Sequence, residues 1–325
     1  MDNISLTCFT ASYAIALLLE ISRLFFRSGV RGAIMLLFAG AGLVAHSWYL
    51  VILAFKNPQG GVPLSSWYSL FLVAAWIMAA IYFYFTYHHA RRSIGMFVLP
   101  IVLGLIGVAY AFSDVEAPAT DDAMGLWLTV HVVSLLLGTV VVSIGFVAGV
   151  MYLVGAWQLK HKAPETGVRL PSLEWCEQVN RRSLSISTVC VAIGMGAGLL
   201  RNLDLLHIND PAGVAWGDPI VWSSALLLGW LTTAVVFRAI YRPARQGRKV
   251  AYLTVVSFLL LALVVAIMML VPSTHSTATL PGESETSPRT AAQPEPRTAA
   301  HPKSHKAAQS NALPSGASSA EGGGA

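Results

Sequence analysis

The sequence predicts an all-α protein, a polytopic membrane bundle of about eight transmembrane helices with both termini outside. Of its 325 residues, 55% are hydrophobic and 11% are charged, and the mean hydropathy is +0.63. Soluble domains carry about 25% charged residues. The composition therefore excludes a soluble globular protein as a class, and the partner it predicts is the lipid bilayer, with no nucleic acid.

Eight apolar stretches are each long enough to cross a hydrocarbon core of roughly 30 Å, which takes about 20 helical residues. Their apolar residues run around the whole helix, without the period of two that the strands of a β-barrel show. In chain order, the expected spans are 4–22, 32–55, 64–87, 95–113, 126–156, 183–203, 219–240 and 249–271. The first has no basic region ahead of it and no small-residue cleavage site, which predicts a retained helix and not a signal peptide.

The connections between these spans alternate in charge, and this alternation predicts the orientation. Basic residues follow the odd-numbered spans: Arg23, Arg27 and Arg31; Arg91 and Arg92; Lys160, Lys162, Arg169, Arg181 and Arg182; Arg238, Arg242, Arg245, Arg248 and Lys249. The other connections carry Lys56 alone and then mainly aspartate. By the positive-inside rule, every odd-numbered connection is cytoplasmic, so both termini are expected outside.

Two segments lie apart from the expected spans. Leu173 to Arg182 has the pattern of a short amphipathic segment on the cytoplasmic surface, ahead of span 183–203. Beyond Ser276 the composition changes to Pro, Ala, Ser, Thr and Gly, which bury too little apolar surface to repay the entropy of ordering. We expect a membrane domain over 1–275 and a disordered external tail over 276–325.

Three histidines and one loop are expected on the external side. His46 lies about 13 Å below the outer end of its span at 1.5 Å per residue, His131 near the start of the fifth span, and His275 just beyond the eighth. The loop before the seventh span holds Trp216, Asp218 and Trp222. Imidazole ligates haem iron, and tryptophan faces can cover a porphyrin. These residues therefore predict a haem-binding site in which His131 and His275 supply both axial positions of the iron.

Other interpretations of these residues stay open. A membrane histidine is often a hydrogen-bonded packing residue, and an interfacial tryptophan is often an anchor. Arg201 has two readings of equal weight, pairing with a haem propionate or reaching the lipid headgroups. Gly194 and Gly198 have the spacing of a GxxxG helix contact, which we favour over a nucleotide-binding loop because no strand precedes them.

The sequence resembles the cytochrome c assembly proteins, particularly their HemX-like and CcsA-like branch, in an ordered series of stretches over roughly residues 40 to 276. The first is HSWYLVILAFKNPQGGVPLSSWYSLFLVAAW from His46, followed by VHVVSLLLGTVVVSIGFVAGVMYLVGAWQLKHK from Val130 and LPSLEWCEQVNRRS from Leu170. WGDPIVWSSALLLGWL from Trp216, the basic RPARQGRKVAYLTVVSF and LVPSTHS around His275 complete the series.

The resemblance implies haem handling at the external face, where two histidines flank a tryptophan-rich segment and present haem for attachment to apocytochrome c. By position, His131 and His275 are similar to the flanking histidines, Trp216, Asp218 and Trp222 to the segment, and His46 to a histidine kept inside an early span. The segment is shorter here than the W-G-x-x-W-x-W-D-P-K-E type, with Ile220 where lysine is common. This departure favours an accessory or HemX-like role.

The function expected is therefore a haem-handling assembly factor of cytochrome c biogenesis, more than a stand-alone enzyme, in the plasma (inner) membrane. Its expected partners are haem and either an apocytochrome c or a cytochrome c synthase subunit. A membrane regulator of haem synthesis without attachment activity is the alternative. A secondary transporter is the third, but such a protein needs ionisable groups near the bilayer midplane. Glu20, near the cytoplasmic end of its span, is the only acid well inside an apolar stretch.

The predicted orientation can be tested by labelling single cysteines in a variant that lacks Cys8, Cys176 and Cys190. Because acidic connections are external, cysteines placed in 114–122 should react with an impermeant maleimide in intact cells. Cysteines in 160–170 and 242–249 should stay protected. Labelling of Arg245→Cys from outside would overturn the orientation and with it the shared external side of the histidines.

Overall fold

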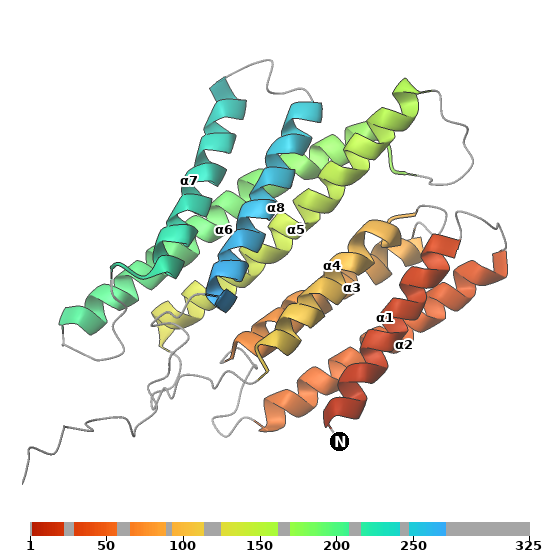
Figure 1. Cartoon of the computed structure of the whole chain (residues 1–325), viewed down its shortest axis with the longest axis horizontal. Helices are drawn as coiled ribbons and strands as arrows, with labels where there is room; N and C mark the ends of the chain where they lie inside the picture. The colour runs from red at the N-terminus through yellow and green to blue at the C-terminus, as the bar shows by residue number, and fades with distance from the viewer. Residues whose placement is uncertain are drawn as a thin grey trace, which may run out of the picture. The chain divides into compact units, whose positions relative to one another are not determined.

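The structure is a computed structural model that describes residues 2–22, 29–56, 66–88, 93–113, 125–161, 170–207, 216–240 and 247–270. The regular secondary structure in these ranges is entirely helical (Figure 1). The chain divides into two units, Met1–Leu280 and Pro281–Ala325, and all described residues belong to the first. The expected tail from residue 276 lies outside the described residues, so its disorder stays a prediction.

Eight helices in the described ranges confirm the prediction of a polytopic helical membrane bundle. They are α1 (Asp2–Ser22), α2 (Gly29–Lys56), α3 (Trp67–His88), α4 (Gly95–Ala111), α5 (Leu126–Lys160), α6 (Leu173–His207), α7 (Pro219–Ile240) and α8 (Gly247–Leu270). Six of them are long and apolar enough to cross a membrane, whereas α1 and α4 are apolar but shorter. The protein is therefore an integral membrane protein.

Helix α6 begins ten residues earlier than the expected span, so the predicted amphipathic segment from Leu173 to Arg182 is the first part of one continuous helix. Ser172 caps the helix, because its Oγ accepts a hydrogen bond from the Trp175 backbone N–H at 3.3 Å. No glycine or proline follows before Gly194, so nothing interrupts the helix once it has started. One face of the segment packs on the protein, where Trp175 meets Phe85 of α3 edge-on at 5.8 Å, and the opposite face, with Glu174 and Arg181, is exposed.

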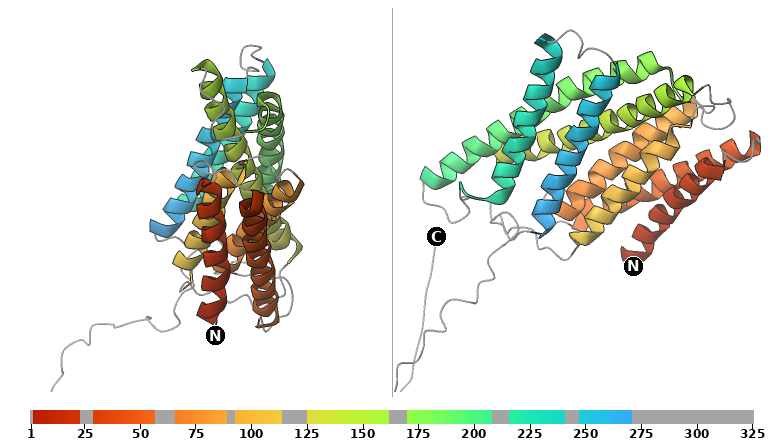
Figure 2. Two further views of the ribbon diagram at one scale, coloured as in Figure 1. Left: turned by 90° about the vertical axis from the view of Figure 1, so that its right-hand side faces the viewer. Right: turned by 45° about the horizontal axis from the view of Figure 1, so that its top comes forward.

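The helices form two groups that meet at α5. Helices α1 to α4 pack on one another in sequence, and α1 closes this group against α4. In the second group α5 packs on α6 and α8, and α7 packs on α6 and α8. Helices α3 and α4 contact α5, and these contacts join the two groups (Figure 2). Successive helices run in opposite directions, so the starts of α1, α3, α5 and α7 lie at one end (Figure 1).

Glycines bring α5 close to its neighbours in the second group. A Cβ added at Gly138 would lie 3.0 Å from Val191 of α6, and one at Gly145 would lie 3.0 Å from Ser183. At Gly149 it would lie 2.7 Å from the Thr254 Oγ1 and 3.1 Å from the Ala251 carbonyl of α8. Helices in lipid approach this closely only where small residues allow it, because van der Waals packing drives their association.

Substituting Gly149 by alanine tests this packing. The added methyl group collides with backbone as well as side-chain atoms of α8, so we expect a loss of about 1–3 kcal/mol from overpacking and a lower melting temperature in detergent. Gly104→Ala is the matched control, because a Cβ there meets nothing within 4 Å. Equal melting temperatures of the two variants would contradict the close α5–α8 contact.

Candidate functional site

The structure separates the expected site residues into three places. His46 lies in α2, inside the first helix group, and His131 lies in the first turns of α5. Trp216, Asp218 and Trp222 lie at the start of α7. Among the described helices, α2 makes no contact with α5, so His46 and His131 do not share one pocket. His275 lies outside the described residues.

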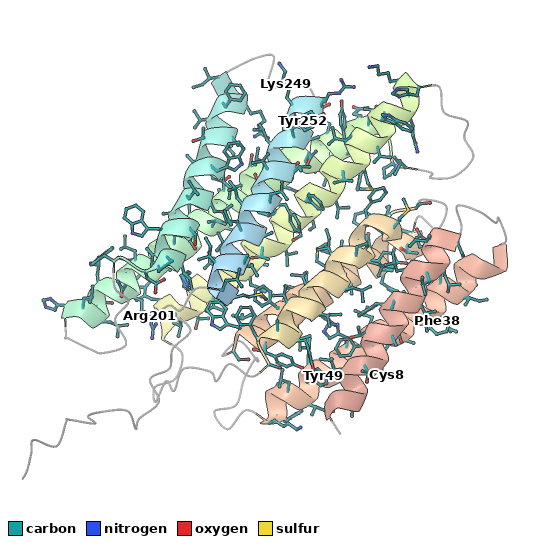
Figure 3. The ribbon with its side chains drawn as sticks, in the orientation of Figure 1. Cys8, Phe38, Tyr49, Arg201, Lys249 and Tyr252 are labelled. Atoms are coloured by element: carbon teal, nitrogen blue, oxygen red, sulfur yellow. The ribbon has the colours of Figure 1, made fainter. Side chains whose placement is uncertain are left out.

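His46 is enclosed by aromatic side chains. Its ring has no exposed surface and stacks on Phe9 of α1 with the centroids 4.2 Å apart and the planes within 2°. The Tyr13 hydroxyl lies 3.4 Å from Nδ1, and Tyr49 lies one turn further along α2 and contacts Phe9. Figure 3 labels Tyr49 among these helices.

The second ring nitrogen of His46 has no hydrogen-bond partner within the described residues, although the backbone of Leu72 in α3 faces the ring. A buried nitrogen without a hydrogen-bond partner carries a desolvation penalty. A ligand that bound to this nitrogen would offset the penalty. Because Phe9 covers one face of the ring and no part of it is exposed, a porphyrin can reach this nitrogen only if the helices around His46 rearrange.

His131 is half-buried and its position is fixed by α6. The Nδ1 atom lies 2.7 Å from the Gly194 carbonyl oxygen. A carbonyl oxygen can only accept, so Nδ1 carries the proton and donates it, and the lone pair of the neutral ring sits on Nε2. Haem- and metal-ligating histidines show this pattern, in which the outer ring nitrogen donates to a backbone carbonyl and fixes the tautomer.

Helices α5 and α8 pack antiparallel, and their register brings the end of α8 near His131. Phe146 stacks on Phe258 with the ring centroids 4.2 Å apart. Twelve residues beyond this pair, α8 reaches its last described residue, Leu270, and α5 reaches position 134. That position is less than one helical turn from His131. Leu270, the last described residue of α8, therefore lies level with the first turns of α5.

Asp218 starts helix α7. Its Oδ1 accepts a hydrogen bond from the Ile220 backbone N–H at 2.8 Å, and Pro219 occupies the first helical position, where a missing N–H costs nothing. The carboxylate is 4% exposed. Asp218 therefore has a structural role as the N-cap of α7, and the charge also suits the helix dipole.

The two tryptophans present their rings at the surface beside this cap. Trp216 is 54% exposed and Trp222 is 68% exposed, and the Trp222 Nε1 donates to the Trp216 carbonyl oxygen at 3.0 Å. Trp222 also lines an apolar groove of about 320 Å³ between α7 and α8, opposite Leu263 and Ile267. The groove offers apolar surface next to the indole rings.

Two further residues of α6 belong to the surroundings of His131. Gly198 lies against its ring, which the GxxxG spacing predicted as a helix contact but not as a histidine contact. Arg201 follows three residues later, so it points from nearly the same face of α6 one turn further out. Figure 3 labels Arg201 near one end of the bundle and Lys249 near the opposite end.

The candidate ligands for a metal or a haem iron are single imidazoles that lie apart from one another. In the part of the chain that the structure describes, no three His, Cys, Asp or Glu side chains come together as a metal cluster. Haem needs only one or two axial ligands, because the porphyrin supplies the other four. A single imidazole such as that of His131 is therefore compatible with haem, which needs no such cluster.

The fold and the site define the class as a polytopic helical membrane protein with the His131 imidazole near one end of its bundle. The chain matches the family of the Cytochrome C assembly protein over residues 34–275 and belongs to it. The match covers α3 to α8 and α2 from residue 34 onward, and it agrees with the resemblance seen over residues 40 to 276. Neither the curated proteins nor the solved structures contain a match to the chain.

Two substitutions of Asp218 distinguish its role as a helix cap from an effect of its charge on a ligand. Asp218→Ala removes the cap and should lower the free energy of unfolding by about 0.5–2 kcal/mol, whereas Asp218→Asn caps almost as well and should keep the stability. Thermal unfolding in detergent measures both. A loss of haem in Asp218→Asn at unchanged stability would show that the charge acts on a ligand and that capping is not its main role.

Proposed function

We propose that this protein binds haem at the external face of the membrane and positions it for cytochrome c assembly, with His131 and His275 as the axial ligands. The observation that carries the proposal is the hydrogen bond from His131 Nδ1 to the Gly194 carbonyl oxygen. It holds the ring in the tautomer that coordinates iron through Nε2. The family supports a role in cytochrome c biogenesis.

The second ligand is proposed from the register of α5 and α8. A six-coordinate haem needs donors on both faces of the ring, and α8 ends within a turn of the level of His131. His275 follows that end by five residues, a chain length that can reach across a porphyrin, since an extended residue spans about 3.3 Å.

The remaining groups would shape the site around the porphyrin. The exposed rings of Trp216 and Trp222 offer flat apolar faces that exclude water, and Arg201 offers a guanidinium to a propionate. Asp218 holds the tryptophans in place by starting α7. Bound haem would supply an iron centre that changes redox state; the chain's own residues bind and orient it.

His46 is the second candidate ligand, at a greater depth. Its second ring nitrogen fits a donor, and because the ring has no exposed surface, haem would bind there only after the surrounding helices rearrange. If His131 and His275 are not ligands, His46 is the next residue to test.

The proposed membrane and orientation follow from the charges of the segments that connect the helices. We place the protein in the plasma (inner) membrane with the site on the external or periplasmic side. The proposed partner is an apocytochrome c or a synthase subunit of the HemX-like or CcsA-like type of system. A membrane regulator of haem synthesis without attachment activity is the second candidate, favoured by the short tryptophan segment and by the use of Asp218 as a helix cap.

Absorption spectra of the purified full-length protein test the proposal. We expect a low-spin haem spectrum, because two imidazoles give a strong ligand field, and a weaker spectrum in His131→Ala and in His275→Ala. Added imidazole should restore it by filling the vacated position. Haem affinity should fall about tenfold or more in each variant.

The matched control is His161→Ala. His161 sits at the other end of α5 and makes the same type of hydrogen bond, from Nδ1 to the Trp157 carbonyl oxygen at 2.9 Å, so it controls for loss of a helix-bound imidazole. It should bind haem like the unmodified protein. Full haem content in both external variants would rule out the two-histidine site.

A further inference from the structure

Gly198 lies against the Nδ1–Cε1 side of the His131 ring. A Cβ added at Gly198 would lie 2.7 Å from the ring Cε1 of His131 and would overlap Nδ1. Such contacts are shorter than real Cβ atoms make, so a side chain at this position requires the ring or the helix to move. The imidazole therefore occupies the volume that a side chain of α6 would otherwise fill.

Gly194, one turn earlier on α6, constrains the same ring in a different way. Its carbonyl oxygen accepts the Nδ1 hydrogen bond at 2.7 Å. A Cβ at Gly194 would lie 2.7 Å from Leu135 Cδ2 and 3.3 Å from the His131 carbonyl oxygen. The short approach of the two backbones thus puts the Gly194 carbonyl within reach of the ring.

Together these two contacts fix both the tautomer and the direction of the ring. The hydrogen bond sets which nitrogen carries the proton, and the contact with Gly198 limits where the Nδ1–Cε1 side of the ring can lie. If a methyl group displaced the ring, the 2.7 Å hydrogen bond would lengthen and Nε2 would point elsewhere. Outer partners of this kind commonly change metal affinity about 10–100-fold when they are removed.

We propose that Gly194 and Gly198 are positioning residues that aim Nε2 of His131 at the haem iron. The two glycines thus allow α5 and α6 to pack closely and also hold the His131 ring in position. The proposal rests on the proposed function, because it assumes that His131 is the ligand, but the contact between Gly198 and His131 can be tested without haem.

The first experiment compares Gly198→Ala with Gly196→Ala in the full-length protein. Both substitutions replace a helical glycine of α6 by alanine, so their effects on helix propensity cancel. Gly196 is the matched control, because a Cβ there meets nothing within 4 Å. We expect Gly196→Ala to bind haem normally and Gly198→Ala to bind it about tenfold more weakly, with a smaller low-spin fraction that added imidazole restores.

The second experiment measures the contact without haem, by thermal unfolding of Gly198→Ala in the presence and absence of His131→Ala. If the methyl group collides with the imidazole, Gly198→Ala lowers the melting temperature of the unmodified protein but not that of His131→Ala. A general packing role of Gly198 would lower both equally. If Gly198→Ala alone fails to accumulate, recovery in the double variant supports the same contact.

The outcomes separate the two proposals. Coupled melting temperatures with full haem in His131→Ala would leave the contact intact and overturn the proposed ligand. Loss of haem in His131→Ala with normal haem binding in Gly198→Ala would keep the ligand and overturn the positioning role. Equal destabilisation by Gly198→Ala in both backgrounds would also overturn it.

Discussion

The close approach of α5 and α6 is the constraint on which the second half of the protein depends. Glycines at 138, 145, 194 and 198 leave room for the two 35-residue helices to run against each other. Lipid provides no hydrophobic force between helices, so this packing has to come from direct contact between small residues and their neighbours. One of those neighbours is the His131 ring, which links the packing of the bundle to the chemistry of the site.

The starts of α5 and α7 and the end of α8 lie at the same end of the bundle (Figure 1). The hydrogen bond to Gly194 holds His131 against α6, the register of Phe146 and Phe258 brings α8 to the same level, and the Asp218 cap starts α7 beside it. Each is an ordinary structural interaction of a helix bundle. Their combination leaves exposed indole rings beside an apolar groove, which suits a flat apolar ligand with an iron at its centre.

Most of the fold could be predicted because the bilayer sets the length of each apolar stretch. Every expected span has a helix, and most of the expected bounds lie within a few residues of the observed ones. The exception is α6, where polar residues such as Glu174 and Arg181 hid a continuous helix that Ser172 had already started. Hydropathy reports burial in lipid and does not report helix continuity beyond it.

The site could be predicted only in part. Sequence placed Gly194 and Gly198 in a helix contact, but which side chain fills the gap depends on the register of α5 against α6, which no local pattern gives. The stacking of His46 on Phe9 likewise depends on how α1 crosses α2. The enclosure of His46 is a consequence of three-dimensional packing. The capping role of Asp218 is local, because an aspartate directly ahead of a proline at the first helical position is a helix-start signal in the sequence itself.

Electron paramagnetic resonance of the ferric, haem-loaded full-length protein tests the central claim most directly, because it reports the number and strength of the axial ligands. Two imidazoles, one of them held by the Gly194 carbonyl, predict a low-spin ferric signal. A high-spin signal that added imidazole converts to low spin would show an axial position without a histidine, and would contradict the two-histidine site.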